Sequence, residues 1–367
     1  MKLALVRRGY SPTGGAERYL LRFAEALREA GHEAILFASP DWPAATWKGD
    51  LIRVQGNTPR HFADALQKAK PRDHADLVFS LERVWDCDAY RAGDGVHRAW
   101  LERRQPFEPP WKSWFRSLQP KHRELLELER SVFDPLANRL IIANSRMVAA
   151  EITHHFRLPP DRIRVIYNGL PPLKVMNIAH MRNKEASCVL LFTGSGWHRK
   201  GLRFAIQAVN QIKDATLLVA GTGKRSGLPP SPRTQFLGPI KDMQTLLEAS
   251  DLFLLPTLYD PFSNASLEAL AAGLPVITTQ ANGFAEIMRP ALDGEVLSSP
   301  SDIDAIVSAI EKWRMENPAS RDSRRHYAAH YTIEENVRQT LAALTCLPPP
   351  YSRAKGPPQA SPGQRPG

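Results

Sequence analysis

The chain has 367 residues, of which 43% are hydrophobic and 23% charged, which is normal for a globular protein of about two domains. Its net charge of +10 at pH 7 predicts an anionic partner, and nucleic acid is disfavoured because zinc-finger, RNP and helix-turn-helix patterns are missing from the sequence. Its apolar runs are shorter than the ~18 residues of a transmembrane helix, and its three widely spaced cysteines favour a reducing cytoplasm.

The first half of the chain alternates predicted strands with predicted helices. The apolar run at residues 2–6 predicts a strand rather than a signal peptide, because it is short and arginines follow it. A helix is predicted over residues 16–30, and further strands at residues 33–38, 140–143 and 162–166. This alternation predicts a parallel α/β sheet and a first Rossmann-like domain over residues 1–170.

Gly14 and Gly15 lie between the first predicted strand and its helix. Glycine at such a place lets the backbone approach a ligand closely at the start of a helix. A lone pair of glycines is also common in ordinary turns, so both interpretations stand. The GxGxxG pattern of dinucleotide-binding proteins is missing here, which argues against a dehydrogenase.

Residues 75–94 predict two short strands, the second of which leads into a Gly-Asp-Gly sequence centred on Asp94. Asp94 is either an active-site carboxylate or a turn former, and His97 is the alternative residue to face a cleft. Asp86 and Asp88 form a DxD pattern, which we interpret as coincidental because no cluster of further metal ligands accompanies it. We therefore predict no metal site.

Arginine, lysine and aromatic side chains are interleaved over residues 98–123, which contain Trp100, Trp111 and Trp114. Tryptophan beside arginine is typical of a segment that lies on an anionic membrane surface. The alternative is a basic helix that packs its aromatic side chains into the core. Three prolines favour a loop-like projection, and hence the membrane interpretation; they are Pro106, Pro109 and Pro110.

Residues 171–187 have no clear periodicity and predict a linker, after which a second Rossmann-like domain is predicted over residues 188–331. Its first strand leads through Gly194 to the adjacent cations Arg199 and Lys200. Arginine can fork onto two phosphate oxygens and lysine supplies a point charge, so the pair could stabilise a leaving nucleoside diphosphate without a metal. A solvated basic turn is the alternative. The strand at residues 217–220 ends at Gly221, which begins a second turn suited to close approach of a ligand.

Residues 252–277 predict a strand, a polar loop, a helix and another strand. Asp260 lies in the loop and Glu268 in the helix, with seven residues between them. Ser263 or Asn264 can cap the helix, whose N-terminus would receive a phosphate group readily. By spacing alone, the two acids could equally be a capping residue and a surface glutamate.

Together these features resemble the retaining family 4 glycosyltransferases of the GT-B fold, and within them the lipopolysaccharide core glucosyltransferase group. The resemblance rests on the glycine turn that precedes Arg199 and Lys200, and on Asp260 and Glu268 at their separation of seven residues. Asp260 departs from the family, which usually has glutamate at this position. The resemblance implies two Rossmann-like domains whose parallel sheets face a central cleft.

By the same resemblance, the first domain binds the acceptor and the second binds the nucleotide sugar. Residues 332–347 are expected to form a C-terminal helix that crosses back to the first domain. Residues 348–367 are rich in proline and predict a disordered tail.

The resemblance also implies roles for twelve residues. Those expected to take part in catalysis are Asp94, Arg199, Lys200 and Asp260. Those expected to bind the donor are Gly14, Gly15, Gly194, Gly221, Phe262, Ser263, Asn264 and Glu268.

The implied activity is transfer of a hexose, glucose being expected, from a UDP-sugar with retention of configuration and without a metal or other cofactor. The implied acceptor is the lipopolysaccharide core or another lipid-linked or cell-surface glycan, reached from the cytoplasmic face of the inner membrane. Two alternatives are a nucleotide-sugar epimerase of the same fold and a non-catalytic protein that binds a membrane surface. A transferase with a soluble acceptor is a third.

Overall fold

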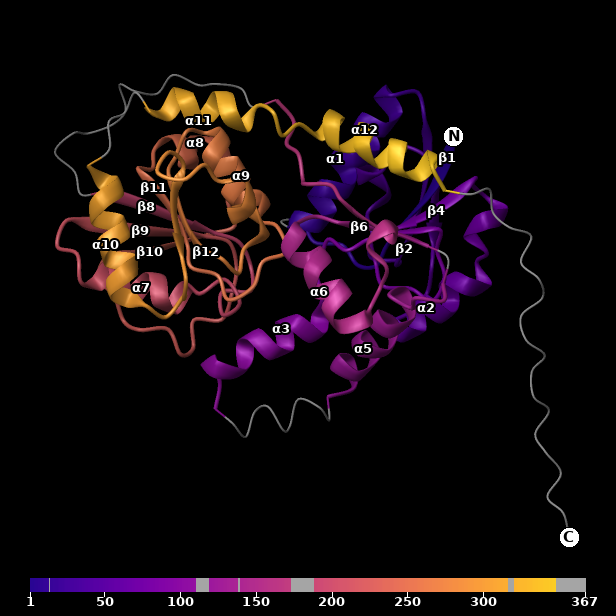
Figure 1. Ribbon diagram of the computed structural model, residues 1–367, viewed down its shortest axis with the longest axis horizontal. Helices are drawn as coiled ribbons and strands as arrows, with labels where there is room; N and C mark the ends of the chain where they lie inside the picture. The colour runs from indigo at the N-terminus through magenta and orange to yellow at the C-terminus, as the bar shows by residue number, and fades with distance from the viewer. Residues whose placement is uncertain (13, 110–118, 138, 173–187, 316–319, 348–367) are drawn as a thin grey trace, which may run out of the picture.

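Two parallel β-sheets, each covered by helices, form the body of the protein in this computed structural model (Figure 1). The structure describes all residues except 13, 110–118, 138, 173–187, 316–319 and 348–367. The predicted tail and most of the predicted linker therefore lie outside the described residues. The α/β architecture with two Rossmann-like sheets is confirmed.

The N-terminal sheet has seven strands in the order β3-β2-β1-β4-β5-β6-β7, all parallel. Its strands are apolar along almost their whole length because helices cover both faces, as parallel sheets require. The strands are β1 (Lys2–Arg7), β2 (Glu33–Ala38), β3 (Leu51–Arg53), β4 (Leu77–Ser80), β5 (Ala89–Arg91), β6 (Leu140–Ala143) and β7 (Ile163–Val165). The helices of this half are α1 (Gly15–Glu29), α2 (Pro59–Lys68), α3 (His97–Arg104), α5 (Pro120–Val132) and α6 (Arg146–Phe156).

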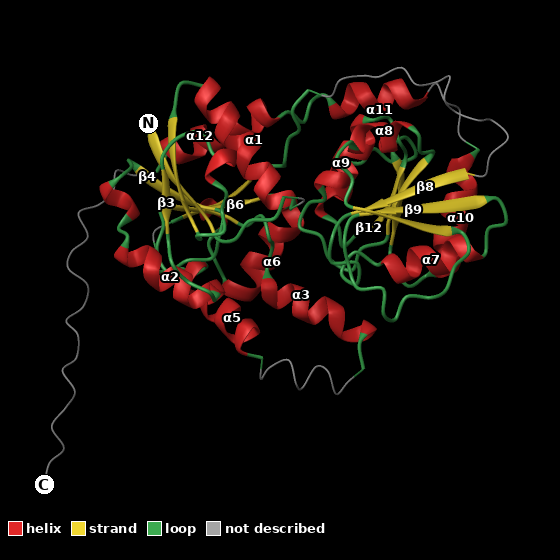
Figure 2. Cartoon of the chain, turned by 180° about the vertical axis from the view of Figure 1, so that it is seen from behind, coloured by secondary structure: helices red, strands yellow, loops and turns green. Residues whose placement is uncertain are grey.

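The C-terminal sheet has six parallel strands in the order β10-β9-β8-β11-β12-β13. They are β8 (Cys188–Thr193), β9 (Ala215–Ala220), β10 (Thr234–Gly238), β11 (Leu252–Leu255), β12 (Val276–Thr279) and β13 (Gly294–Leu297). Its helices are α7 (Leu202–Asn210), α8 (Met243–Glu248), α9 (Asn264–Ala271), α10 (Ile303–Arg314) and α11 (Ser320–Ala328). Figure 2 shows α7 and α10 on one face of this sheet and α8, α9 and α11 on the other.

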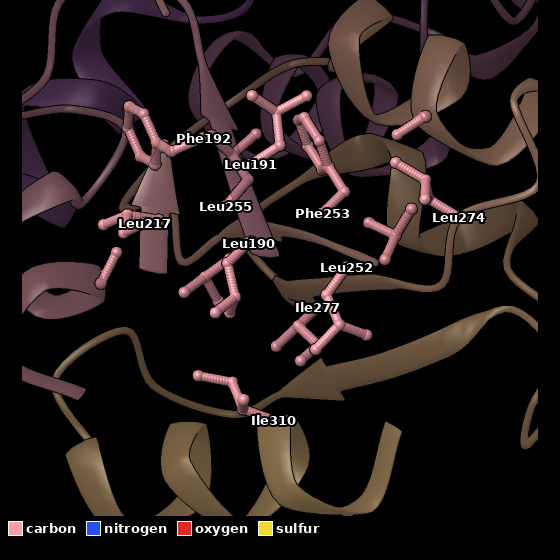
Figure 3. Close-up of a cluster of buried hydrophobic side chains, with 14 of the residues drawn as sticks. Leu190, Leu191, Phe192, Leu217, Leu252, Phe253, Leu255, Leu274, Ile277 and Ile310 are labelled. Atoms are coloured by element: carbon pink, nitrogen blue, oxygen red, sulfur yellow. The ribbon is translucent and has the colours of Figure 1, made fainter. Parts of the chain in front are cut away.

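The core of the C-terminal half joins neighbouring strands to the helices that cover them. Figure 3 shows Leu190, Leu252 and Ile277 from three adjacent strands lying on the side of the sheet where Ile310 of α10 packs. All four side chains are fully buried. Burying a side chain of this size contributes about 1.5–3 kcal/mol, so this cluster holds β8, β11 and β12 in register.

Helix α12 (Ile333–Thr345) packs against α1 of the N-terminal half, although it follows α11 in the chain (Figure 1). Ile333, Val337 and Leu344 join the buried cluster beneath α1, and the Tyr19 hydroxyl donates to Asn336 Oδ1 at 2.8 Å. Both sheets are thus tied together by a helix as well as by the connection after β7. Within the described residues, every helix is too short or too polar to cross a membrane.

The described parts of the region from residue 96 to 136, on either side of residues 110–118, are largely helical, whereas Pro106, Pro109 and Pro110 predict a loop-like projection. They contain α3 and α5, with a 3₁₀ turn at Gln105–Phe107 between them. Pro120 occupies the first turn of α5, where a missing N–H group costs nothing, so this proline begins a helix rather than preventing one. Elsewhere in the described residues, 3₁₀ turns lie at Ala44–Thr46, Pro71–Asp73, Pro160–Arg162 and Gly283–Ile287.

Candidate active site

A cleft with a volume of about 1360 Å³ lies between the two halves and is lined by residues of both. In each sheet the order of the strands reverses beside its first strand, between β1 and β4 and between β8 and β11. Parallel sheets bind ligands at the carboxyl ends of the strands where the order reverses. All twelve predicted site residues line this cleft: Gly14, Gly15, Asp94, Gly194, Arg199, Lys200, Gly221, Asp260, Phe262, Ser263, Asn264 and Glu268.

Lys200 and Asp260 form a buried ion pair at the C-terminal side of the cleft. Lys200 Nζ lies 3.0 Å from Asp260 Oδ2, and the Arg199 guanidinium is 4.0 Å from the same oxygen. Burial raises the pKa of the Asp260 carboxyl, but Lys200, Arg199 and the backbone N–H of Phe262 have the larger, opposite effect. The pKa therefore lies below its ordinary value and the carboxyl stays ionised. Arg199 also donates to the carbonyl oxygen of Tyr259 at 2.9 Å, which orients its guanidinium.

The glycine turns after β8 and β9 are explained by close packing. A Cβ at Gly194 would lie 2.6 Å from the Lys200 side chain, and one at Gly221 would lie 2.3 Å from the carbonyl oxygen of Gly194. Both residues also have a positive φ, of 122° and 115°. These two glycines therefore let the turns approach each other and let Lys200 reach Asp260.

Helix α9 points its N-terminus at the cleft. Ser263 Oγ accepts the backbone N–H of Ser266 at 3.2 Å and so caps the helix, as the sequence predicts. The Phe262 ring is buried between Tyr167 and Phe284, with ring centroids 5.9 Å away in each case, which anchors the turn before the cap. The first N–H groups of α9 therefore face the cleft, and the buried Phe262 ring and the Ser263 cap fix their position.

Glu268 lies one turn into α9 and its side chain is only 9% exposed. Its Oε1 atom accepts a hydrogen bond at 3.2 Å from Arg22 Nη1 of α1, which belongs to the other half of the molecule. The interpretation of Glu268 as an ordinary surface glutamate is therefore wrong, because the residue forms an ion pair across the two halves.

Asp94 faces the cleft from the N-terminal side, with 40% of its side chain exposed. Arg7 Nη1 is 2.9 Å from Asp94 Oδ2 and 3.8 Å from Glu82 Oε2, and Arg7 Nη2 pairs with Glu17. Partial burial raises the pKa of the Asp94 carboxyl, but Arg7 and Arg83 lower it below its usual range. The N–H of Gly95 donates to the Ala92 carbonyl at 3.0 Å, so Asp94 both stands in a turn and faces the cleft.

His97 lines the same cleft but has a histidine as its partner. Its Nε2 atom lies 2.9 Å from His122 Nδ1, and the two rings stack with centroids 5.1 Å apart. Burial and the nearby cations lower the pKa of His97 to about 3, so its ring is neutral at physiological pH. Both candidates from this turn thus reach the cleft, and of the two only Asp94 is charged.

Three residues that contribute to the site were not singled out from the sequence: Arg7, Glu82 and Tyr259. Arg7 ends β1 and Glu82 follows β4, so the rule that sites gather at strand ends could have found them. The Tyr259 hydroxyl donates to Glu151 Oε2 at 2.7 Å and accepts the backbone N–H of Val96 at 2.8 Å. It therefore fastens the C-terminal half to the N-terminal half beside the cleft.

Asp86 and Asp88 lie outside the residues that line the cleft. Arg72 contacts both carboxylates, at 2.6 and 2.7 Å. The DxD pattern is accounted for by this shared ion pair.

The basic aromatic segment at residues 98–123 is partly packed against the C-terminal half. The Trp100 ring lies 6.3 Å from the Tyr259 ring, and the Phe107 ring lies 5.7 Å from that of Phe204. Arg103 pairs with Glu151 at 2.8 Å, and Arg104 pairs with Glu108. Trp100 and Phe107 are thus half-buried against the C-terminal half, which agrees with the alternative of a basic helix that packs its aromatic side chains, while Trp111 and Trp114 lie outside the described residues.

Two family models match the chain, one in each half. Residues 13–172 match the model described as Glycosyltransferase Family 4, and residues 187–314 match the model described as Glycosyl transferases group 1. Together they extend over well more than half of the sequence, and both halves contribute to the cleft. The chain belongs to the family 4 glycosyltransferases of the GT-B fold.

Individual relatives agree with this assignment. The lipopolysaccharide glucosyltransferase WaaG of Escherichia coli (strain K12) is 24% identical over 358 residues, which cover 87% of this chain and 92% of that protein. The lipopolysaccharide core biosynthesis glycosyltransferase LpsE of Rhizobium meliloti (strain 1021) is 23% identical over 317 residues, or 84% and 88% of the two chains.

Solved structures show the same fold. The crystal structure of WaaG superposes with a TM-score of 0.78 at 22% identity, covering 94% of this chain and all (100%) of that one. Anabaena Alr3699/HepE in complex with UDP-glucose superposes with a TM-score of 0.68 at 18% identity, covering 94% and 100%. The protein is thus a glycosyltransferase similar to those of lipopolysaccharide core synthesis.

Proposed function

We propose that this glycosyltransferase moves glucose from UDP-glucose, with retention of configuration and without a metal ion, to a lipopolysaccharide core or another lipid-linked or cell-surface glycan. Similarity to WaaG and LpsE supports the class of acceptor, and similarity to HepE supports the donor. The observation that carries the proposal is the buried pair of Lys200 and Asp260 beside the N-terminus of α9.

On the donor side, the diphosphate would lie between the start of α9 and the cations Arg199 and Lys200. A helix N-terminus and two cations in a partly buried cleft stabilise the negative charge that develops as the sugar–phosphate bond breaks. Glu268 would accept hydrogen bonds from ribose hydroxyls, and Asp260 would hold hydroxyls of the transferred sugar. The arginine and lysine supply the positive charge that a divalent metal supplies in other phosphate chemistry.

Retention follows in this proposal from attack on the face that the leaving group vacates. The bond from the anomeric carbon to the diphosphate oxygen breaks as the acceptor oxygen forms a new bond to that carbon. The departing diphosphate oxygen takes the acceptor proton. Asp94, ionised across the cleft, would position the donor or the acceptor.

We also propose that the enzyme works in the cytoplasm, on the inner face of the membrane that carries its acceptor. Lys121 and Arg123 support this because both are exposed at the start of α5, next to the tryptophan-containing residues 110–118. Basic side chains near an anionic surface contribute about 1 kcal/mol each to membrane attachment.

The first experiment is to measure binding and hydrolysis of a panel of nucleotide sugars by wild type and by Glu268→Ala in the presence of EDTA. A signal that depends on UDP-glucose and is lost in Glu268→Ala supports the donor assignment and metal independence together. If the sugar changes identity without an acceptor, the epimerase alternative gains instead. If no nucleotide sugar binds while anionic vesicles do, the chain acts as a membrane-binding protein and the proposal fails.

A further inference from the structure

Arg91, the last residue of β5, is a buried arginine that lines the cleft and was not assigned a role above. Only 2% of the residue is exposed. One Nη group donates to Asn168 Oδ1, and the guanidinium carbon lies 4.3 Å from the centroid of the Tyr19 ring. The other group, Nη1, is buried and finds no hydrogen-bond partner in the part of the chain that the structure describes.

Two other arginines of the cleft, Arg7 and Arg83, are neutralised by carboxylates. Arg7 pairs with Glu17 and Asp94, and Arg83 pairs with Glu129. Among the described residues, no carboxylate pairs with Arg91. A buried charge without a counter-ion costs stability, and an aromatic ring and a neutral amide offset only part of that cost.

The direction in which each guanidinium pKa is shifted agrees with this difference between Arg91 and the paired arginines Arg7 and Arg83. Burial alone lowers the pKa of all three guanidinium groups, but carboxylates beside Arg7, and Tyr90 together with carboxylates beside Arg83, raise the pKa of these two groups above the ordinary value. The pKa of Arg91 remains below its ordinary value, because burial is opposed only by Tyr19.

The position of Arg91 connects the two helices that begin at the cleft. Tyr19, on which it stacks, lies in α1. Asn168, to which it donates, in turn donates through Nδ2 to Asn264 Oδ1 at 2.6 Å, and Asn264 is the first residue of α9. Arg91 is therefore held by two contacts within the N-terminal half, and Asn168 connects it to the N-terminal end of α9, where an anion is favoured.

We propose that Arg91 binds a phosphate group of a bound substrate. This phosphate group supplies the negative counter-charge for the buried guanidinium. This inference deepens the proposed function and rests on it. The phosphate comes either from the donor diphosphate or from a phosphorylated acceptor, and both sources offer the paired oxygens that a guanidinium recognises.

The test compares wild type with Arg91→Met by calorimetric titration of uridine, UMP, UDP and pyrophosphate. If the donor supplies the phosphate, UDP and pyrophosphate bind Arg91→Met about 10- to 100-fold more weakly, the size of one charge-assisted hydrogen bond, while uridine binds equally. Arg91→Lys, which keeps the charge, regains part of the affinity. If the acceptor supplies the phosphate, UDP affinity is unchanged, and KM rises for a lipopolysaccharide core preparation but not for the same preparation after phosphatase treatment.

Arg324→Met is the matched control. Arg324 is also fully buried and lies 5.6 Å from the centre of the Trp313 ring, but it donates to the carbonyl oxygens of Leu292 and Gly273 and lies outside the residues that line the cleft. We expect Arg324→Met to lower the unfolding temperature without changing UDP affinity. Arg91→Met should unfold at the wild-type temperature or higher, because an apolar side chain replaces an uncompensated charge.

The inference is overturned if UDP and pyrophosphate affinity and the acceptor preference of Arg91→Met all match wild type, whatever its unfolding temperature. Titration with pyrophosphate distinguishes a failure of this inference from a failure of the proposed function, because pyrophosphate tests phosphate binding without the nucleoside and the sugar. If wild type binds pyrophosphate, Arg91→Met does not, and neither protein binds a UDP-sugar, then the inference about Arg91 is supported and the proposed donor is wrong.

Discussion

Replacing Lys200 by methionine tests the central ion pair. Methionine keeps most of the volume of the side chain but removes the ammonium group that lies 3.0 Å from Asp260. If Lys200 stabilises the leaving diphosphate, kcat should fall about 10²- to 10³-fold, as when one donor is removed from a charge-stabilising site. The assay is glucose transfer from UDP-glucose to a lipopolysaccharide core acceptor, followed by release of UDP.

The same change should also destabilise the fold. Asp260 is 6% exposed, and without Lys200 its remaining cation is Arg199 at 4.0 Å. Leaving a buried carboxylate without its partner costs about 3–5 kcal/mol, and Arg199 favours the lower end of that range. A loss of about 3 kcal/mol corresponds to roughly 6–12 °C in unfolding temperature for a domain of this size.

The sign of the pH dependence follows from the lowered pKa of Asp260 in the folded wild type. The contribution of this group to wild-type stability is present above its unfolded pKa and is lost as pH falls through the folded pKa. In Lys200→Met the folded pKa of Asp260 rises, so the buried carboxylate costs most stability at neutral pH. The difference in unfolding temperature between the two proteins should therefore narrow as pH falls from 7 towards 4.

A double variant separates catalysis from stability. Adding Asp260→Asn to Lys200→Met removes the uncompensated charge and should return most of the lost stability, but not the lost activity. A Lys200→Met enzyme with wild-type kcat would refute the role of Lys200 in leaving-group stabilisation, whatever its unfolding temperature.

Three further predictions concern separate contacts. Glu268→Gln should raise the KM for UDP-glucose about 10-fold or more, and an unchanged KM would remove its ribose role. Tyr259→Phe should cost about 1–3 kcal/mol in urea unfolding because its hydroxyl serves both Glu151 and a backbone N–H, and wild-type stability would show that these bonds contribute nothing. The double variant Lys121→Glu with Arg123→Glu should co-sediment less than wild type with phosphatidylserine vesicles, and equally with neutral vesicles. If wild type and variant co-sediment equally with phosphatidylserine vesicles, this surface is excluded.

Much of the fold could be predicted from local sequence patterns. Apolar runs such as residues 2–6 and 188–192 predicted strands, because a strand buried on both faces is apolar throughout. Helices α2, α3 and α5 were not predicted, although the sequence carries the signal for α2 and α5. Phe62 and Leu66 in α2, and Leu128 and Val132 in α5, are buried at the four-residue spacing that places side chains on one helix face.

Spacing alone predicted only the part of the candidate site that one crossover unit contains, while the resemblance added residues from elsewhere in the chain, such as Asp94, Arg199 and Lys200. Asp260 and Glu268 belong to one strand–loop–helix unit, so their separation in the sequence specifies their separation in space. Arg22 and Glu268 are 246 residues apart, and their contact depends on how the two sheets face each other. The packing of Trp100 could not be predicted for the same reason, because its partner Tyr259 comes from the other half.

The ion pair between Arg22 and Glu268 leads to a last prediction, opposite in sign to that for Glu268. The ribose hydroxyls proposed for Glu268 must compete with Arg22 for the same carboxylate. The Arg22 side chain is 28% exposed, and a partly exposed pair of this kind contributes about 0.2–1 kcal/mol. Arg22→Met should therefore tighten UDP-glucose binding by up to about 5-fold, measured by calorimetry.

The contacts around Tyr259 do not involve Glu268, so they should keep the two halves together on their side of the cleft when Arg22 is changed. Small-angle scattering can check that Arg22→Met keeps the wild-type radius of gyration, which separates local competition from a general opening of the molecule. Weaker binding in Arg22→Met would mean that Arg22 itself contacts the donor. In that case Glu268 and Arg22 would act together on the nucleotide, and the competition argued here would be wrong.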